Sequence, residues 1–189
     1  MEKNQTNSDA EKGASKTKSG KTLNDLFEKS LKGIYSAEKQ LLVALPEMAK
    51  AADNEDLQDI FTEHLQETKR QVERIEKIFE RLDIDKKDEK TCKIMQSIIE
   101  DANKMSTEYE QGPVRDSALI IAAQKIEHHE IAAYESLCEL AEALGYPKVA
   151  EILERTLAEE EDIENNLCCL VQEINDEAFE TSHREEQPA

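Results

Sequence analysis

Residues 122–133 read Ala-Ala-Gln-Lys-Ile-Glu-His-His-Glu-Ile-Ala-Ala, so acidic and histidine side chains stand within an otherwise apolar stretch. If this stretch is helical, with about 100° between successive residues, Glu130 lies on the apolar face. The other members of that face are Leu119, Ala122, Ala123, Ile126, Ala133, Leu137, Ala141 and Leu144. A carboxylate buried at such a position must be neutralised, paired with a cation or bound to a metal.

The composition indicates a helical protein with a strong negative charge. The chain has 189 residues, no Trp, only 4% aromatic residues and 35% charged residues. Its 43 acidic and 24 basic residues give a formal net charge of -19, which disfavours nucleic acid and anionic membrane surfaces as partners. No apolar run is long enough to span a membrane and no secretory signal is visible, so we expect a cytoplasmic protein.

The four cysteines do not follow a zinc-binding spacing. They are Cys92, Cys138, Cys168 and Cys169. Because adjacent cysteines rarely pair with each other, we expect core or surface thiols rather than a redox role.

The periodicity of apolar residues predicts four long helices and one shorter helix. The long helices are expected from Thr22 through an apolar stripe that ends at Ala49, with a break at Asp53 and Asn54, then from Leu57 to about Leu82, from Pro113 to about Leu144, and from Pro147 to about Asn175. A shorter helix is expected from about residue 92 to 105. We predict a flexible tail over residues 1–21, one domain over residues 22–175, and a flexible acidic tail over residues 176–189.

An internal repeat relates the two halves of the domain. A constant offset of 92 residues aligns Glu38 with Glu130, and it also aligns the apolar positions without a gap over about sixty residues. Two amphipathic helix pairs often share an apolar register by chance, but a matching buried acid is harder to explain in this way. We therefore predict an all-α, ferritin-like four-helix bundle, in which a long crossover with a shorter fifth helix joins two helical hairpins.

Ferritin-like bundles carry dinuclear sites built from carboxylates and a few histidines. The predicted metal ligands are one Glu from the first helix of each hairpin and two residues from the second helix of each hairpin. One further acid lies near the edge of the third long helix. These residues are Glu38, Glu130, His64, Glu67, Glu160, Glu164 and Glu127. Such an oxygen-rich set suits two iron or manganese ions better than a thiolate-rich zinc site. The alternatives are a buried salt bridge at Glu38 and Glu130 and an ordinary core histidine at His64, while Glu127 and Glu164 lie near the edges of their stripes.

Five motifs in order resemble the bacterial YciF-like stress proteins. They are Tyr-Ser-Ala-Glu-Lys-Gln-Leu at residues 35–41, His-Leu-Gln-Glu-Thr at 64–68, the stretch at 122–132, Leu-Gly-Tyr at 144–146, and Leu157 with the acids at 159–161. The resemblance, which covers residues 21–170, implies a ferritin-like bundle, a dinuclear metal site, homodimers and a link to stress responses. Members of that family commonly carry an aspartate where this chain has Glu164.

Three hypotheses for function follow. The first is a dinuclear iron or manganese protein that reacts with peroxide or oxygen. The second is an iron-sequestering protein, which requires a cage of many subunits. The third is a metal-free helical interaction module, in which the buried acids are paired or protonated.

Overall fold

Five helices make up the described part of the chain. The computed structural model describes residues 21–86 and 90–185, and these residues contain no strand. The helices are α1 (Leu23–Ala51), α2 (Glu55–Leu82), α3 (Lys93–Glu108), α4 (Pro113–Ala143) and α5 (Pro147–Glu185). The predicted all-α fold is confirmed.

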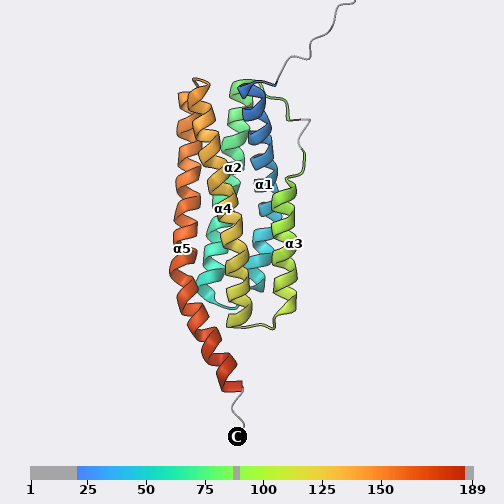
Figure 1. The fold of residues 1–189 in the computed structure, drawn as a ribbon, viewed down its shortest axis with the longest axis vertical. Coiled ribbons are helices and arrows are strands. Elements are labelled where there is room, and N and C mark those ends of the chain that lie inside the picture. Colours follow the sequence, from blue (N-terminus) through green and yellow to red (C-terminus); the bar gives the residue numbers. More distant parts are fainter. Residues whose placement is uncertain (1–20, 87–89, 186–189) are drawn as a thin grey trace, which may run out of the picture.

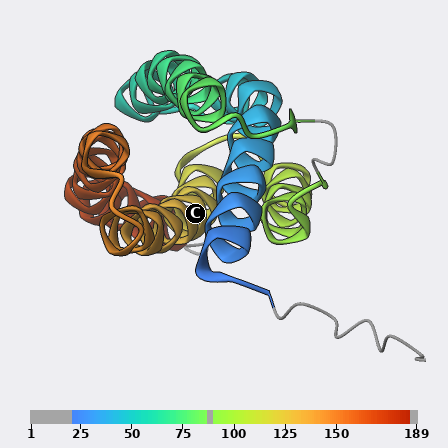
Figure 2. The same cartoon turned by 90° about the horizontal axis from the view of Figure 1, so that it is seen from above.

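The helices form two hairpins joined by a long crossover (Figure 1). α1 packs on α2, and α4 packs on α5. The crossover returns along the bundle, so that α2 and α4 run in the same direction (Figure 1). α3 belongs to this crossover and lies outside the four long helices, against α1 and α4 (Figure 2). One long crossover between two hairpins is the connectivity of ferritin-like bundles.

Local sequence signals define the helix ends. Thr22 and Asp25 form a capping box at the start of α1. The Asn54 side chain accepts a hydrogen bond from the backbone N–H of Leu57 at 3.0 Å, which caps α2. Gly145 follows α4 with a φ of +76°, a left-handed conformation that glycine adopts without strain, and α5 begins two residues later.

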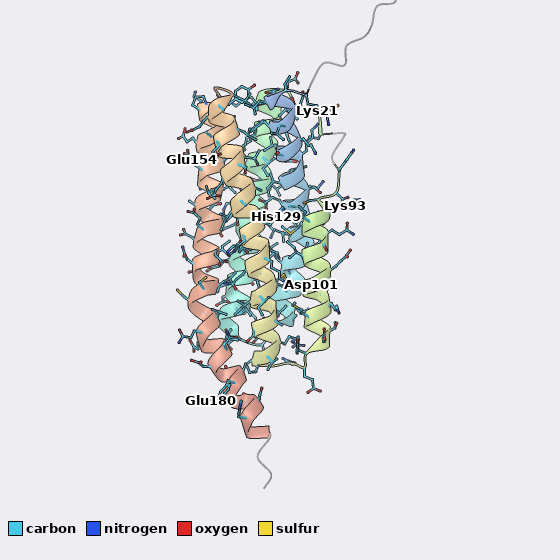
Figure 3. The ribbon with its side chains drawn as sticks, viewed as in Figure 1. Lys21, Lys93, Asp101, His129, Glu154 and Glu180 are labelled. Atoms are coloured by element: carbon cyan, nitrogen blue, oxygen red, sulfur yellow. The ribbon has the colours of Figure 1, made fainter. Side chains whose placement is uncertain are left out.

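The predicted end of the last helix is wrong. α5 does not stop near Asn175 but continues to Glu185. No Gly or Pro interrupts residues 148–185, and the Phe179 and His183 rings stack one turn apart with their centroids at 3.9 Å. The portion that carries Glu180 extends beyond the other helices (Figures 1 and 3). The tails expected at residues 1–20 and 186–189 lie outside the described residues.

The core is apolar at both ends of the bundle and polar in the middle. Its largest fully buried side chains include Phe27, Phe61, Phe79 and Tyr134.

All four cysteines are free thiols, and Cys168 and Cys169 are exposed. Among the described helices, none combines the length and the apolar character that crossing a bilayer requires.

A buried carboxylate fixes the loop between α1 and α2 to α4. Asp116 is 2% exposed, and its two oxygens accept hydrogen bonds from the backbone N–H groups of Asp53 and Asn54, both at 2.8 Å. Because Asn54 is the N-cap of α2, Asp116 also places negative charge at the positive end of that helix.

We expect Asp116→Ala to lower the free energy of unfolding by about 1–2 kcal/mol, since it leaves two partly buried backbone donors without their acceptor. Urea denaturation followed by circular dichroism measures the change. Asp59→Ala, at an exposed position on α2, is the control and should change stability by less than about 0.5 kcal/mol. Equal effects of the two substitutions would contradict this role.

Candidate metal centre

Two acids related by the repeat lie deep in the bundle. Glu38 on α1 and Glu130 on α4 are both 0% exposed, as the apolar stripes around them predicted. The Tyr134 hydroxyl, one turn after Glu130, donates a short hydrogen bond to Oε1 of Glu38. The tyrosine therefore orients the Glu38 carboxylate and leaves its second oxygen available.

His64 on α2 lies between three buried carboxylates. Its Nδ1 is 3.3 Å from Oε1 of Glu127, and its Nε2 is 3.9 Å from Oε2 of Glu130 and 3.6 Å from Oε2 of Glu160 on α5. One ligand atom from each of these four residues lies within 4.8 Å of the others, and all four side chains are buried. Three helices thus deliver a compact group of potential metal ligands.

The imidazole does not neutralise these acids. Burial lowers the pKa of His64 to about 4, so the ring is neutral near pH 7. Its short distances to the carboxylates are therefore contacts of a neutral ring rather than ion pairs. A neutral imidazole is, however, the form that binds a metal ion.

Burial opposes ionisation of all the acids in this group. It raises the pKa of Glu38 to about 8, although the Tyr134 hydrogen bond acts in the opposite direction. Burial, followed by the charges of neighbouring acids, raises the pKa values of Glu127, Glu130 and Glu160 well above the usual range. The cluster must hold protons or a compensating cation.

Several oxygens of the cluster have no hydrogen-bond partner. Both oxygens of Glu130, both of Glu160, and one each of Glu38 and Glu127 are buried and unpaired among the described residues. Buried polar atoms in native proteins are normally satisfied. These oxygens and the Nε2 of His64, which is also unpaired, are the donor atoms that one or two hard or borderline metal ions require.

An ion pair lies against the cluster between α2 and α5. The Arg74 guanidinium donates to both oxygens of Glu159, at 2.5 and 2.6 Å, and Gln71 Nε2 donates to the same carboxylate at 3.3 Å. Burial alone would raise the pKa of Glu159, but the Arg74 contact lowers it. The Glu159 side chain is only 17% exposed.

The structure does not bring all seven predicted ligands together. It gathers His64, Glu127, Glu130 and Glu160 with Glu38 beside them, but Glu67 is 27% exposed and lies 3.6 Å from Arg70. Glu164 is 15% exposed and accepts a hydrogen bond from Gln124. Metal binding by Glu67 and Glu164 stays a prediction.

His129 belongs to the surroundings of the cluster. It lies near the middle of α4, and its Nε2 is 3.7 Å from Sγ of Cys92 at the start of α3 (Figure 3). The Cys92 backbone N–H donates to Ser36 Oγ of α1 at 2.9 Å, and Gln40 Nε2 donates to the Cys92 carbonyl at 3.2 Å. These contacts hold the start of α3 against the bundle, a role that the sequence did not reveal.

Comparisons with known proteins agree with this architecture. The family described as Domain of unknown function (DUF892) matches residues 22–180. Protein YciF of Escherichia coli is 48% identical over 140 residues, which are 74% of this chain and 84% of that protein.

Two solved structures extend the comparison. The crystal structure of the E. coli stress protein YciF has a TM-score of 0.79 and 44% identity, and the match covers 83% of this chain and 99% of the other. YcfI of Rhodopseudomonas palustris has a TM-score of 0.75 and 35% identity, and the match covers 80% of this chain and 96% of the other. The chain therefore belongs to the DUF892 family and is a relative of the bacterial stress protein YciF.

Proposed function

We propose that this YciF-like protein holds two iron or manganese ions in its core and reacts there with hydrogen peroxide or oxygen. The observation that carries the proposal is the set of four unpaired oxygens on Glu130 and Glu160, which lie beside a neutral imidazole in the buried core. Bound iron or manganese ions would supply reversible one-electron steps, two of which match the reduction of a peroxide.

Each side chain around such a centre has a distinct role. Glu38, Glu127, Glu130 and Glu160 supply oxygen ligands, and His64 supplies the nitrogen ligand. Tyr134 holds Glu38 by its hydroxyl, and the Arg74–Glu159 pair covers the centre between α2 and α5. The apolar residues on either side exclude water, which strengthens the attraction between carboxylates and cations.

A metal-free structural bundle is the competing function. The full burial of Glu38 favours it, because burial disfavours the ionised carboxylate and raises its pKa to about 8, so the acid can stay protonated when no cation is bound. The two functions differ in what the purified protein contains and in how its stability depends on pH. The homodimer implied by the resemblance stays a prediction, which light scattering would test.

We expect protein purified without added metal or chelator to contain about two iron or manganese ions per chain. Glu38→Ala combined with Glu130→Ala should remove most of this metal, since it deletes the paired acids of α1 and α4. Elemental analysis gives the content. Glu161→Ala, at an exposed position next to Glu160, is the matched control and should retain the metal. An equal metal content in the parent, the double variant and the control would show that the ions bind at another site.

We expect the metal-loaded protein to consume many equivalents of hydrogen peroxide per chain when a reductant is supplied, or to consume oxygen after reduction. The double variant should show neither reaction. A peroxide electrode and an oxygen electrode measure these rates. Consumption that stops after one equivalent per metal would favour iron sequestration, and loaded protein without either reaction would refute the redox function.

The metal-free protein should lose stability as the pH rises from 6.5 to 8. The pKa of Glu38 is raised from 4.5 to about 8, so the folded state holds a proton that the unfolded state has released. Glu38 alone then lowers the free energy of unfolding by about 1 kcal/mol per pH unit, and the raised pKa values of Glu127, Glu130 and Glu160 act in the same direction. His64 acts oppositely, but only below pH 6.5, because its pKa is lowered.

Urea denaturation of chelator-treated protein at several pH values tests this dependence. Glu38→Gln removes one of four titrating acids and should make the profile less steep without flattening it, because Glu127, Glu130 and Glu160 still titrate. Reloading with manganese should also remove the loss of stability, because bound metal favours the ionised acids. A flat profile in the metal-free parent would mean that the cluster is solvated or already compensated.

A further inference from the structure

A groove with basic walls lies between α2 and α5. It has a volume of about 560 Å³, and it lies at the end of the bundle where α2 ends and α5 begins (Figure 1). Five of its seven lining residues are basic and one is acidic, in a chain whose formal net charge is -19. The lining residues are Arg74, Lys77, Arg81, Lys148, Glu151, Ile152 and Arg155.

Helical spacing brings these cations to one place. On α2, Arg74, Lys77 and Arg81 follow one another at intervals of three and four residues and therefore share a face. On α5, Lys148 and Arg155 are seven residues apart, which also places them on one face. The first turn of α5 carries no acid, so the positive end of its helix dipole adds to the field in the groove.

Acids of the chain neutralise only part of this charge. Glu159 accepts hydrogen bonds from Arg74, and its Oε1 lies 3.6 Å from Nε of Arg155. The other three basic side chains of the groove are exposed and form no ion pair with an acid in the described structure. Even when Glu151 and Glu159 are both counted, the basic side chains around the groove exceed the acids by three.

Ordinary surface roles do not explain the whole set. Arg81 lies in the last turn of α2, where a cation stabilises the helix dipole. An exposed lysine such as Lys77 is commonly just solvated. Neither role accounts for the cations on the facing helix, because like charges around one groove repel each other. A bound anion would remove this repulsion.

We propose that this groove binds the phosphate group of a small molecule. Three of the five basic residues are arginines, whose guanidinium groups donate pairs of hydrogen bonds to phosphate oxygens. The volume is within the range of small-molecule pockets, so the groove has room for more than the phosphate itself. Ile152 offers an apolar contact for the remainder of such a ligand. Nucleic acid is disfavoured as the source of the phosphate, because the chain as a whole is strongly negative.

Arg74 connects the groove to the buried cluster. Its side chain is 11% exposed, and it is held by Glu159, which directly precedes Glu160. A phosphate that approaches Arg74 competes with the Glu159 carboxylate for the same guanidinium donors. Glu159 therefore opposes binding of the anion. Binding itself requires no metal ion, so this site does not depend on the proposed function.

Isothermal titration calorimetry of the metal-free full-length protein tests the site, because phosphate then has no bound metal to coordinate. The probes are inorganic phosphate and ribose 5-phosphate, each at low ionic strength. We expect both to bind, and we expect sodium chloride at about 0.5 M to weaken the binding by screening the charges. Tighter binding of ribose 5-phosphate would identify a phosphate ester as the ligand, and equal affinities would identify the free ion at the same site.

Arg81→Gln combined with Lys148→Gln should weaken the binding of both probes by roughly tenfold, since it removes one exposed cation from each wall. Lys29→Gln combined with Lys32→Gln is the matched control. These two lysines line a different groove beside α1, and their replacement removes the same formal charge. The control should change the dissociation constants by less than about twofold. Circular dichroism verifies that both variants are folded.

Glu159→Gln should act in the opposite direction. It removes the acid that holds Arg74 and Arg155, so both guanidinium groups become available to the phosphate. We expect the dissociation constants to fall by roughly threefold. A structural change that merely loosened the helices would weaken binding instead, and that result would contradict the competition between Glu159 and the anion.

Other outcomes overturn the inference. If the parent protein binds neither probe at millimolar concentration, the groove is not a phosphate site. Equal weakening by the two double variants would show that affinity follows the net charge of the protein rather than this groove. Unchanged affinity in the Arg81→Gln and Lys148→Gln variant would show that the anion binds at another place.

Discussion

The main constraint on this structure is the burial of four glutamates beside one neutral histidine. Glu38, Glu127, Glu130 and Glu160 are all nearly or fully excluded from solvent. Carboxylates cannot remain ionised and uncompensated in such a core. Protons or metal ions must supply the missing positive charge. Protons would leave the bundle with acids where leucines would pack better, since an apolar replacement avoids the desolvation cost.

The rest of the bundle is arranged to make this burial possible. The apolar side chains occupy both ends of the core, so that the polar layer need not hold the helices together by itself. Tyr134 fixes one acid by its hydroxyl. Arg74 lies beside the layer but is already paired with Glu159, so it covers the cluster without neutralising it. The compensating charge therefore has to come from bound protons or from a small cation that fits among the carboxylates.

The sequence revealed the fold and the inner acids because both depend on helical periodicity. Glu38 and Glu130 interrupt apolar stripes at matching positions, so their burial could be predicted without coordinates. Glu67 and Glu164 fit the same spacing, but they lie near stripe edges, where a small rotation of the helix decides between core and solvent. The continuation of α5 was missed because an acidic segment with few apolar residues looks like a tail, although nothing in it stops a helix.

Other residues could not be found from the sequence because their partners come from distant parts of the chain. Asp116 binds backbone groups more than sixty residues away, and Arg74 meets Glu159 across two helices. No local pattern marks either contact. The surroundings of Glu164 also could not be predicted from a local pattern in the sequence. Helical spacing made it a ligand candidate, but the packing of α4 on α5 brings Gln124 to its carboxylate, where the Gln124 amide donates to Oε1 at 3.3 Å. Glu164 therefore lies outside the group of ligand atoms around His64.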